Sequence, residues 1–270
     1  MVASPRLLIA SGFFIVAASF IPDRAKAQQQ RYSEERNADV PVAGARGVRI
    51  DARAGSLRVE GRSGLTQVRV KGVARSNQRG RLADIRLIAE RRGNDIYIKA
   101  DIPESNGDDW RFGDGPQMAL DLVIEVPMTL PLEVDDSSGE ALFLNTGRLT
   151  LDDASGAIEV RGSHGSVEIE DGSGEIEIDG VEGDVIVSDG SGEISIANVT
   201  GDVTIEDDGS GSIDVAGVGG TFRVGSDGSG DIDVGRVAGD FVVDSDGSGG
   251  IKYSDVKGRV QIPERRRRRS

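Results

Sequence analysis

The stretch DGSGEIEIDGVEGDVIVSDGSGEISI, residues 171–196, contains the tetrapeptide Asp-Gly-Ser-Gly twice, and the second copy begins eighteen residues after the first. Related tetrapeptides precede and follow it. They begin at Asp136, Asp153, Asp171, Asp189, Asp208, Asp227 and Asp246. From Asp153 onward the spacings are 18, 18, 19, 19 and 19 residues. A near-constant period over six or seven copies is typical of a repeat architecture, in which each unit buries its apolar face against its neighbours.

Within each copy the apolar residues recur with a period of two, which indicates short strands rather than helices. In the copy that begins at Asp171, Ile176 and Ile178 alternate with acidic residues, and Val185 and Val187 follow after a GVEG corner. The same positions are apolar in the later copies. The sequence therefore predicts an all-β fold, a parallel β-solenoid of about seven coils of 18–19 residues with an N-terminal β cap.

The Asp-Gly-Ser-Gly segments predict turns, because glycine accepts positive φ and aspartate bonds the backbone N–H two residues on. Stacked coils place one aspartate per coil in a column. Its members are Asp171, Asp189, Asp208, Asp227 and Asp246, with Asp153 before them. Carboxylates about 5 Å apart repel by roughly 0.8 kcal/mol in water. We expect turn hydrogen bonds and salt screening to offset this repulsion. The alternative is a weak ladder of divalent cations, with no firm metal site and no cofactor.

Composition divides the chain into segments. Arg6 precedes an apolar run that ends near Ile21, and Ala25-Lys26-Ala27 offers a cleavage site after Ala27, so the start predicts export. The predicted segments are a signal peptide (1–27), a disordered linker (28–39), an N-terminal β cap or early coils (40–132), the solenoid repeats (133–262) and a basic disordered tail (263–270).

Charge is distributed unevenly along the chain. Residues 133–262 contain 29 acidic and 7 basic residues, an excess of 22 negative charges, whereas residues 28–132 contain 15 acidic and 17 basic residues. So acidic a segment repels phosphates, which argues against nucleic acid as a partner. The five arginines at 265–269 have two interpretations. They contact an anionic envelope surface, or they prevent another chain from adding a strand.

This arrangement resembles the "putative adhesin" families, which are exported bacterial proteins of unknown function. The resemblance extends from about residue 40 to residue 262. It depends on VIEVPMTLPLEV at 123–134 and on SGEIEI, SGEISI, SGSIDV and SGDIDV in the repeats. It implies a right-handed β-helix and a cell-envelope location, and it brings no catalytic residues. The five-arginine ending is not part of the family's pattern.

We expect a non-enzymatic, exported β-solenoid that presents a rigid acidic surface for cell-envelope binding or adhesion, in the periplasm or at the cell surface. The outward positions of the first strand of each coil form an acidic series, which comprises Glu159, Glu177, Ser195, Asp214, Asp233 and Lys252. Those of the second strand carry less charge and comprise Glu168, Ile186, Thr204, Arg223 and Val242. We predict that an envelope protein or glycan contacts this second series.

Two further features leave alternatives open. Trp110 and Phe112 lie in an acidic loop and either stack on a sugar or peptide or plug the cap. The alternative function is a carbohydrate-active β-helix enzyme acting on an envelope polysaccharide. His164 is the one histidine of the chain and lies in a corner, and the corners are too short to build a substrate groove.

Overall fold

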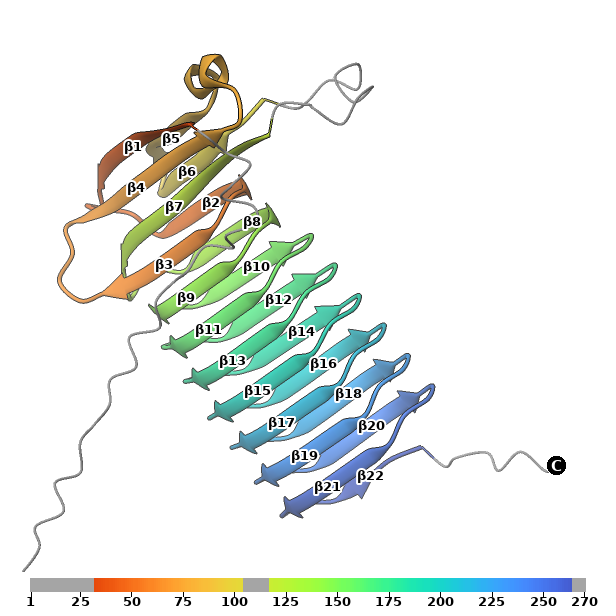
Figure 1. The fold of residues 1–270 in the computed structure, drawn as a ribbon. Coiled ribbons are helices and arrows are strands. Elements are labelled where there is room, and N and C mark those ends of the chain that lie inside the picture. The colour runs from red at the N-terminus through yellow and green to blue at the C-terminus, as the bar shows by residue number, and fades with distance from the viewer. Residues whose placement is uncertain (1–31, 104–116, 264–270) are drawn as a thin grey trace, which may run out of the picture.

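The computed structural model describes residues 32–103 and 117–263. Over these two ranges the chain forms 22 strands and one 3-10 helix, arranged in two sheets of eleven strands. Sheet A extends from β1 (Tyr32–Pro41) to β21 (Ile251–Val256), and sheet B extends from β5 (Arg86–Arg92) to β22 (Val260–Gln261). The strands stack along an elongated body, with the cap at one end and β21 and β22 at the other (Figure 1).

Each coil contributes one strand to each sheet, and the strands of successive coils pair in parallel (Figure 1). In sheet A these strands are β9 (Ala141–Thr146), β11 (Ile158–Ser163), β13 (Ile176–Val181), β15 (Ile194–Val199), β17 (Ile213–Val218), β19 (Ile232–Val237) and β21. In sheet B they are β8 (Leu132–Ser138), β10 (Leu149–Asp153), β12 (Val167–Asp171), β14 (Val185–Asp189), β16 (Val203–Asp208), β18 (Phe222–Asp227), β20 (Phe241–Asp246) and β22. The predicted parallel β-solenoid of about seven coils is confirmed.

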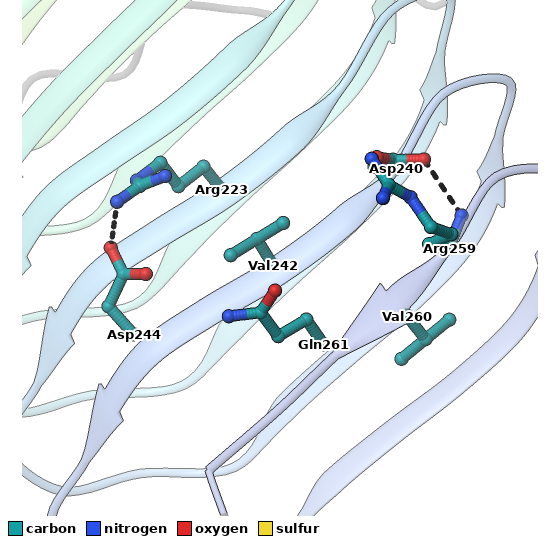
Figure 2. A pocket seen from close by; sticks show the side chains of 7 residues that line it. All are labelled: Arg223, Asp240, Val242, Asp244, Arg259, Val260 and Gln261. Carbon is teal, nitrogen blue, oxygen red and sulfur yellow. Dashed lines mark hydrogen bonds and ion pairs between the residues drawn. The ribbon is translucent and has the colours of Figure 1, made fainter.

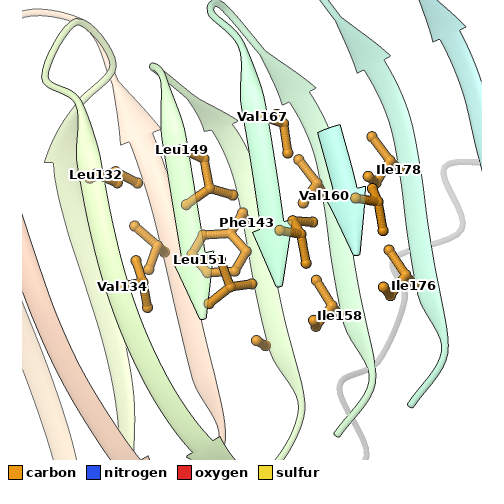
Figure 3. Close-up of a cluster of buried hydrophobic side chains, with 14 of the residues drawn as sticks. Leu132, Val134, Phe143, Leu149, Leu151, Ile158, Val160, Val167, Ile176 and Ile178 are labelled. Carbon is orange, nitrogen blue, oxygen red and sulfur yellow. The ribbon is translucent and has the colours of Figure 1, made fainter. Parts of the chain in front are cut away.

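The apolar columns predicted from the period of two form the core between the sheets (Figure 3). In the coil that begins at Asp171 the five apolar side chains are at most 1% exposed; they are Ile176, Ile178, Val181, Val185 and Val187. Burying one such side chain contributes roughly 1.5–3 kcal/mol. Because the positions repeat in register, the core is one continuous aliphatic column.

The second glycine of each Asp-Gly-Ser-Gly corner is required by a close backbone contact. Gly192 has a φ of +154°, and a β-carbon there would lie 1.5 Å from the carbonyl oxygen of Gly174 in the preceding coil. One coil earlier, a β-carbon on Gly174 would lie 1.6 Å from the carbonyl oxygen of Gly156. The corners are therefore turns, and any side chain at this position would hold successive coils apart.

The N-terminal region extends the solenoid and then closes it. β2 (Gly47–Ala54) and β3 (Leu57–Arg62) pair in parallel with β8 and β9, which adds one coil. Antiparallel pairing begins beyond them. It involves β1, β4 (Gln67–Ser76) and β7 (Met118–Pro127) in sheet A, and β5 and β6 (Asp95–Asp101) in sheet B. The region is thus both an early coil and a cap.

One expectation is wrong in this region. Residues 32–39 belong to β1 rather than to a disordered linker. β1 pairs antiparallel with β4 along its whole length, from Tyr32 opposite Ser76 to Pro41 opposite Gln67. This pairing supplies backbone hydrogen bonds to a segment that has few apolar residues to indicate a strand. Within the part of the chain that the structure describes, no helix is long and apolar enough to span a membrane.

Candidate functional site

The outward side chains stack in register on both sheets, as the repeat predicts. On sheet A, Glu177 lies opposite Glu159 and Ser195, and the series continues through Asp214 and Asp233. On sheet B a second column, here called the mixed strip, comprises Glu168, Ile186, Thr204, Arg223, Val242 and Gln261. The structure therefore aligns all five residues of the second predicted series, from Glu168 to Val242.

The mixed strip is a single column of side chains, and a second outward column lies beside it on the same sheet. Each strand of sheet B has a second outward position, and this neighbouring column is acidic. Its acidic members are Asp135, Asp152, Glu170, Glu206, Asp207 and Asp244, all of them exposed. The predicted series included one outward position per strand, so it did not include this acidic column. What remains is one mixed column beside an acidic one.

A β-bulge explains why the repeat spacing changes from 18 to 19 residues. β14 has five residues, whereas β16, β18 and β20 have six. Val187 lies opposite Ile205 but Ser188 lies opposite Asp207, so no residue of β14 faces Glu206. Gly225 and Asp244 take the place of Glu206 in the next two coils. A bulge bends a strand and redirects its side chains.

The bulged coils form an open depression of about 660 Å³ at the C-terminal end of the mixed strip (Figure 2). Seven residues line it: Arg223, Asp240, Val242, Asp244, Arg259, Val260 and Gln261. Arg223 forms an ion pair with Asp244, and Arg259 Nη2 lies 3.0 Å from Asp240 Oδ2. The backbone N–H of Arg259 also donates to Asp240 at 2.8 Å. These hydrogen bonds lower the pKa of Asp240.

A smaller depression, of about 370 Å³, lies on the same sheet near the cap. Arg46, Arg49 and Arg148 contribute to its wall. Arg49 bridges Asp95 and Glu133, with a distance of 3.3 Å to each carboxylate. Both ends of the sheet B face thus carry arginines, and the coils between them carry the acidic column.

The corner aspartates form a second candidate feature, a column inside the turns. Seven aspartates lie opposite one another in successive coils: Asp136, Asp153, Asp171, Asp189, Asp208, Asp227 and Asp246. We call this column the aspartate ladder. All but Asp246 are buried, and Asp208 is fully inaccessible. Sequence analysis predicted the column but not its burial.

One carboxylate oxygen of several ladder members closes the predicted turn. The backbone N–H groups of Ser155, Ser173 and Ser191 donate to Asp153, Asp171 and Asp189 at 3.2, 3.1 and 3.1 Å. The local hydrogen bonds expected for these corners are therefore present. The second oxygen of each of these aspartates is buried without a hydrogen-bond donor. In Asp208 and Asp227 this holds for both oxygens.

Burial raises the pKa of all six buried members of the ladder. It raises the pKa of Asp208 from 3.8 to about 7, and the neighbouring charge of Asp227 adds to this rise. Burial likewise raises the pKa of Asp136 to about 7 and those of Asp171 and Asp227 to about 6. A protonated carboxyl can donate to the next carboxylate in the column, which supplies the missing donor. Among the described residues, no group of three or more His, Cys, Asp or Glu side chains is arranged to hold a metal ion.

The remaining predicted residues lie elsewhere. His164 Nδ1 lies 3.0 Å from Glu182 Oε2 on an exposed corner. Ala27, Trp110, Phe112 and residues 265–269 fall outside the described ranges. Sequence reasoning missed Asp240, Asp244 and Arg259 in the depression. The change of spacing from 18 to 19 residues was the available sign that the strands differ there.

No family model matches the sequence, and no curated relative matches it. Solved structures with a similar arrangement include three bacterial proteins. A putative adhesin from Bacteroides fragilis is 10% identical, with 87% of this chain and 99% of that chain covered and a TM-score of 0.34. A putative cell adhesion protein from Clostridium sporogenes is 10% identical, with 86% and 99% covered and a TM-score of 0.29. A putative lipid binding protein from Parabacteroides distasonis is 14% identical, with 86% and 98% covered and a TM-score of 0.36.

The structural neighbours thus include proteins described as adhesins, the kind of family that the repeats resemble.

Proposed function

We propose that this protein is a non-enzymatic, exported β-solenoid that binds a protein or glycan of the cell envelope through the mixed strip of sheet B. The observation that carries the proposal is the mixed strip itself. It is a register-aligned column of one carboxylate and of apolar, hydroxyl, guanidinium and amide groups on an otherwise acidic shaft, and it ends in the depression around Val242. Apolar contact combined with a few fixed polar groups is the usual chemistry of a binding site.

The side chains of the mixed strip suit a rigid, extended partner. Ile186 is 36% exposed, an unusual level for a large aliphatic residue in this chain, and Arg223 is also exposed. Arginine is enriched among the residues that contribute strongly to interfaces. Since the backbone beneath them is held in continuous sheet, little conformational entropy is lost when a partner binds.

The depression favours binding over glycoside hydrolysis. A glycosidase requires one carboxylic acid with a raised pKa beside a carboxylate that acts as base or nucleophile. The two carboxylates of the depression, Asp240 and Asp244, are each paired with an arginine, and the pKa of Asp240 is lowered. Asp240 is therefore not suited to act as the acid.

The test is a binding assay with separate polysaccharide and protein pools from a bacterial envelope fraction. We expect the double substitution Ile186→Asp and Val242→Asp to abolish retention of the bound pool while the circular dichroism spectrum stays unchanged. The matched control is Glu177→Ser with Asp214→Ser and Asp233→Ser on sheet A, which should leave binding intact. Binding that survives the first variant and is lost in the control would place the partner on the acidic face.

The location follows from the same proposal. We propose that cleavage after Ala27 releases the chain into the periplasm or onto the cell surface, since the first residues have the composition of a signal peptide. The acidic columns keep the shaft soluble. The arginines at 265–269 then contact an anionic surface, or guard the last strand against addition of another chain.

A further inference from the structure

The C-terminal end of the solenoid leaves core positions uncovered. β21 and β22 form the end of the rod opposite the cap (Figure 1). Tyr253 is 50% exposed and Ile262 is 39% exposed. In the preceding coil the matching core positions are at most 2% exposed; they are Ile232, Val234, Val237, Phe241 and Val243. The last coil therefore presents an apolar cross-section of the core to its surroundings.

The N-terminal end shows what a covered end looks like in this protein. The 3-10 helix η1 (Arg79–Asp84) contacts both β1 and β4, and Leu82 and Ile85 are buried there. Arg36 of β1 donates to the carbonyl oxygens of Leu82 and Ile85 at 3.1 and 3.3 Å. Within the described residues, no comparable element lies over β21 and β22.

The acidic columns of the shaft stop before the last coil. On sheet A the outward series changes from Asp233 to Lys252, and on sheet B Val242 lies opposite Gln261. Each basic side chain that the structure describes in the last coil has an acidic partner; the pairs are Lys252 with Asp231, Lys257 with Asp255 and Arg259 with Asp240. This part of the last coil is therefore close to neutral.

The chain that follows the last coil is strongly basic. Residues 265–269 are five consecutive arginines, and residues 246–270 together contain eight basic and three acidic residues. Arg269 follows Pro263 by six residues, so at most about 22 Å of extended chain separates them. The positive charge therefore stays near the apolar end. At a strand spacing of about 4.8 Å, acidic residues more than about two coils away lie beyond the Debye length of roughly 8 Å.

We propose that the C-terminal end docks onto an anionic phospholipid bilayer, with its apolar cross-section at the level of the headgroups and the arginines against the lipid phosphates. Attachment to a bilayer surface is strengthened by buried apolar area and by attraction between basic residues and anionic lipids. Tyr253 suits this depth, because a tyrosine ring is apolar and its hydroxyl is polar. The contact is separate from the mixed strip and does not depend on the proposed function.

Backbone hydrogen bonding limits how deeply this end can enter the bilayer. β21 and β22 are the terminal strands of sheets A and B, so each pairs along one side only. Unpaired backbone groups are not tolerated in the hydrocarbon region, whereas headgroups and their water offer partners. The contact therefore lies at the bilayer surface. A second copy of the chain fits this end less well, because it would bring two basic segments together.

Co-sedimentation of the full chain with vesicles measures the contact. One set of vesicles contains equal parts of phosphatidylglycerol and phosphatidylcholine, and the other contains phosphatidylcholine alone. The second set gives the contribution of the apolar run near the N-terminus, which needs no anionic lipid. The wild type should bind the anionic vesicles more tightly, and Arg265→Gln through Arg269→Gln should weaken that binding at least about a hundredfold.

A pair of double variants tests the apolar contribution. Tyr253→Asp with Ile262→Asp should weaken binding to the anionic vesicles at least about tenfold. The matched control is Tyr32→Asp with Val123→Asp, which adds the same charge at exposed apolar positions of the cap and should leave binding within about twofold. All four side chains are at least 39% exposed in the wild type, which makes both variants compatible with folding.

The chain contains no cysteine, so an introduced cysteine can carry a polarity-sensitive fluorophore at a single site. On anionic vesicles the emission of labelled Tyr253→Cys should shift to shorter wavelength, whereas that of labelled Val123→Cys should not. Binding that survives the loss of the five arginines overturns the proposal. So does binding that depends on the arginines but is unchanged in Tyr253→Asp with Ile262→Asp, which would assign the contact to the arginines alone. Loss of vesicle binding in Ile186→Asp with Val242→Asp would instead assign it to the mixed strip.

Discussion

At the scale of single residues, the corner aspartates are the least expected feature of this molecule. The sequence predicts them as turn residues, and the turn hydrogen bonds of Asp171 and Asp189 are present. Their burial was predictable as well. In β14 the period of two that places Val185 and Val187 inward continues to Asp189. The inward orientation of the aspartate was not predicted, because the residue was assigned to the start of a corner rather than to the end of a strand.

The aspartate ladder predicts an unusual pH dependence of stability. Folding raises the pKa of Asp208 from its ordinary 3.8 to about 7, so the folded state holds this proton more tightly than the unfolded state does. The corresponding stabilisation is complete below pH 3.8 and is lost as the pH rises through about 7. The urea midpoint should therefore be higher at pH 5 than at pH 8. Asp208→Asn should reduce this difference.

Surface repulsion among the acidic columns acts in the same direction, so a matched control is required. Asp214→Asn removes one exposed carboxylate of sheet A and leaves the ladder intact. If both substitutions change the pH dependence equally, the ladder contributes nothing specific. Calcium at millimolar concentration should leave the urea midpoint of the wild type unchanged if protons rather than divalent cations occupy the ladder.

At the scale of strands and coils, the sequence predicted the columns and missed the bulge. Alternation is a local pattern, so it assigned inward and outward positions such as Ile213 and Asp214 from a few neighbouring residues. The bulge at Glu206 depends on how one coil pairs with the next, which no single strand reveals. The depression includes Asp244, which occupies the position of Glu206 two coils later and forms an ion pair with Arg223. The alternation within each strand is therefore enough to predict the fold, whereas the candidate site depends on how neighbouring coils pair.

Adjacent residues of β17 test the inward and outward assignment. Ile213 is fully buried, so Ile213→Asp places an unpaired carboxylate in the aliphatic column and should cost roughly 4 kcal/mol of unfolding free energy. Asp214 is exposed, and Asp214→Ser should cost under about 0.5 kcal/mol. Urea unfolding followed by circular dichroism measures both. Equal shifts of the two midpoints would contradict the assignment.

At the scale of the whole molecule, the chain is a rod with a nearly neutral cap and a strongly acidic shaft. Residues 28–132, the part of the chain that includes the cap, contain 17 basic and 15 acidic residues, whereas residues 133–262 have an excess of 22 negative charges. An anionic surface therefore repels the shaft much more strongly than the cap. The sequence alone indicates this polarity, since the cap and shaft are consecutive in the chain.

Export is the prediction that belongs to this scale. The charged start, the apolar run and the small residues at 25–27 predict cleavage after Ala27. Protein recovered from the envelope fraction should begin at Gln28 on N-terminal sequencing. Recovery of the intact chain from the cytosol, beginning at Met1, would show that the first residues serve another purpose.

Each coil contacts only its neighbouring coils, so a force on one end of the rod can detach the coils one at a time from that end. A force on the C-terminus acts first on β22 and β21. When these strands detach, the neighbouring coil becomes the new terminal coil and is exposed to the force in the same way. We expect the cap to unfold last under force, because its strands are antiparallel and Arg36 donates hydrogen bonds to the carbonyl oxygens of Leu82 and Ile85. Each coil that peels away releases 18 or 19 residues, or roughly 65 Å of extended chain. A protein of this kind that tethers two surfaces would therefore lengthen in nearly equal steps under load and dissipate mechanical energy before it detached.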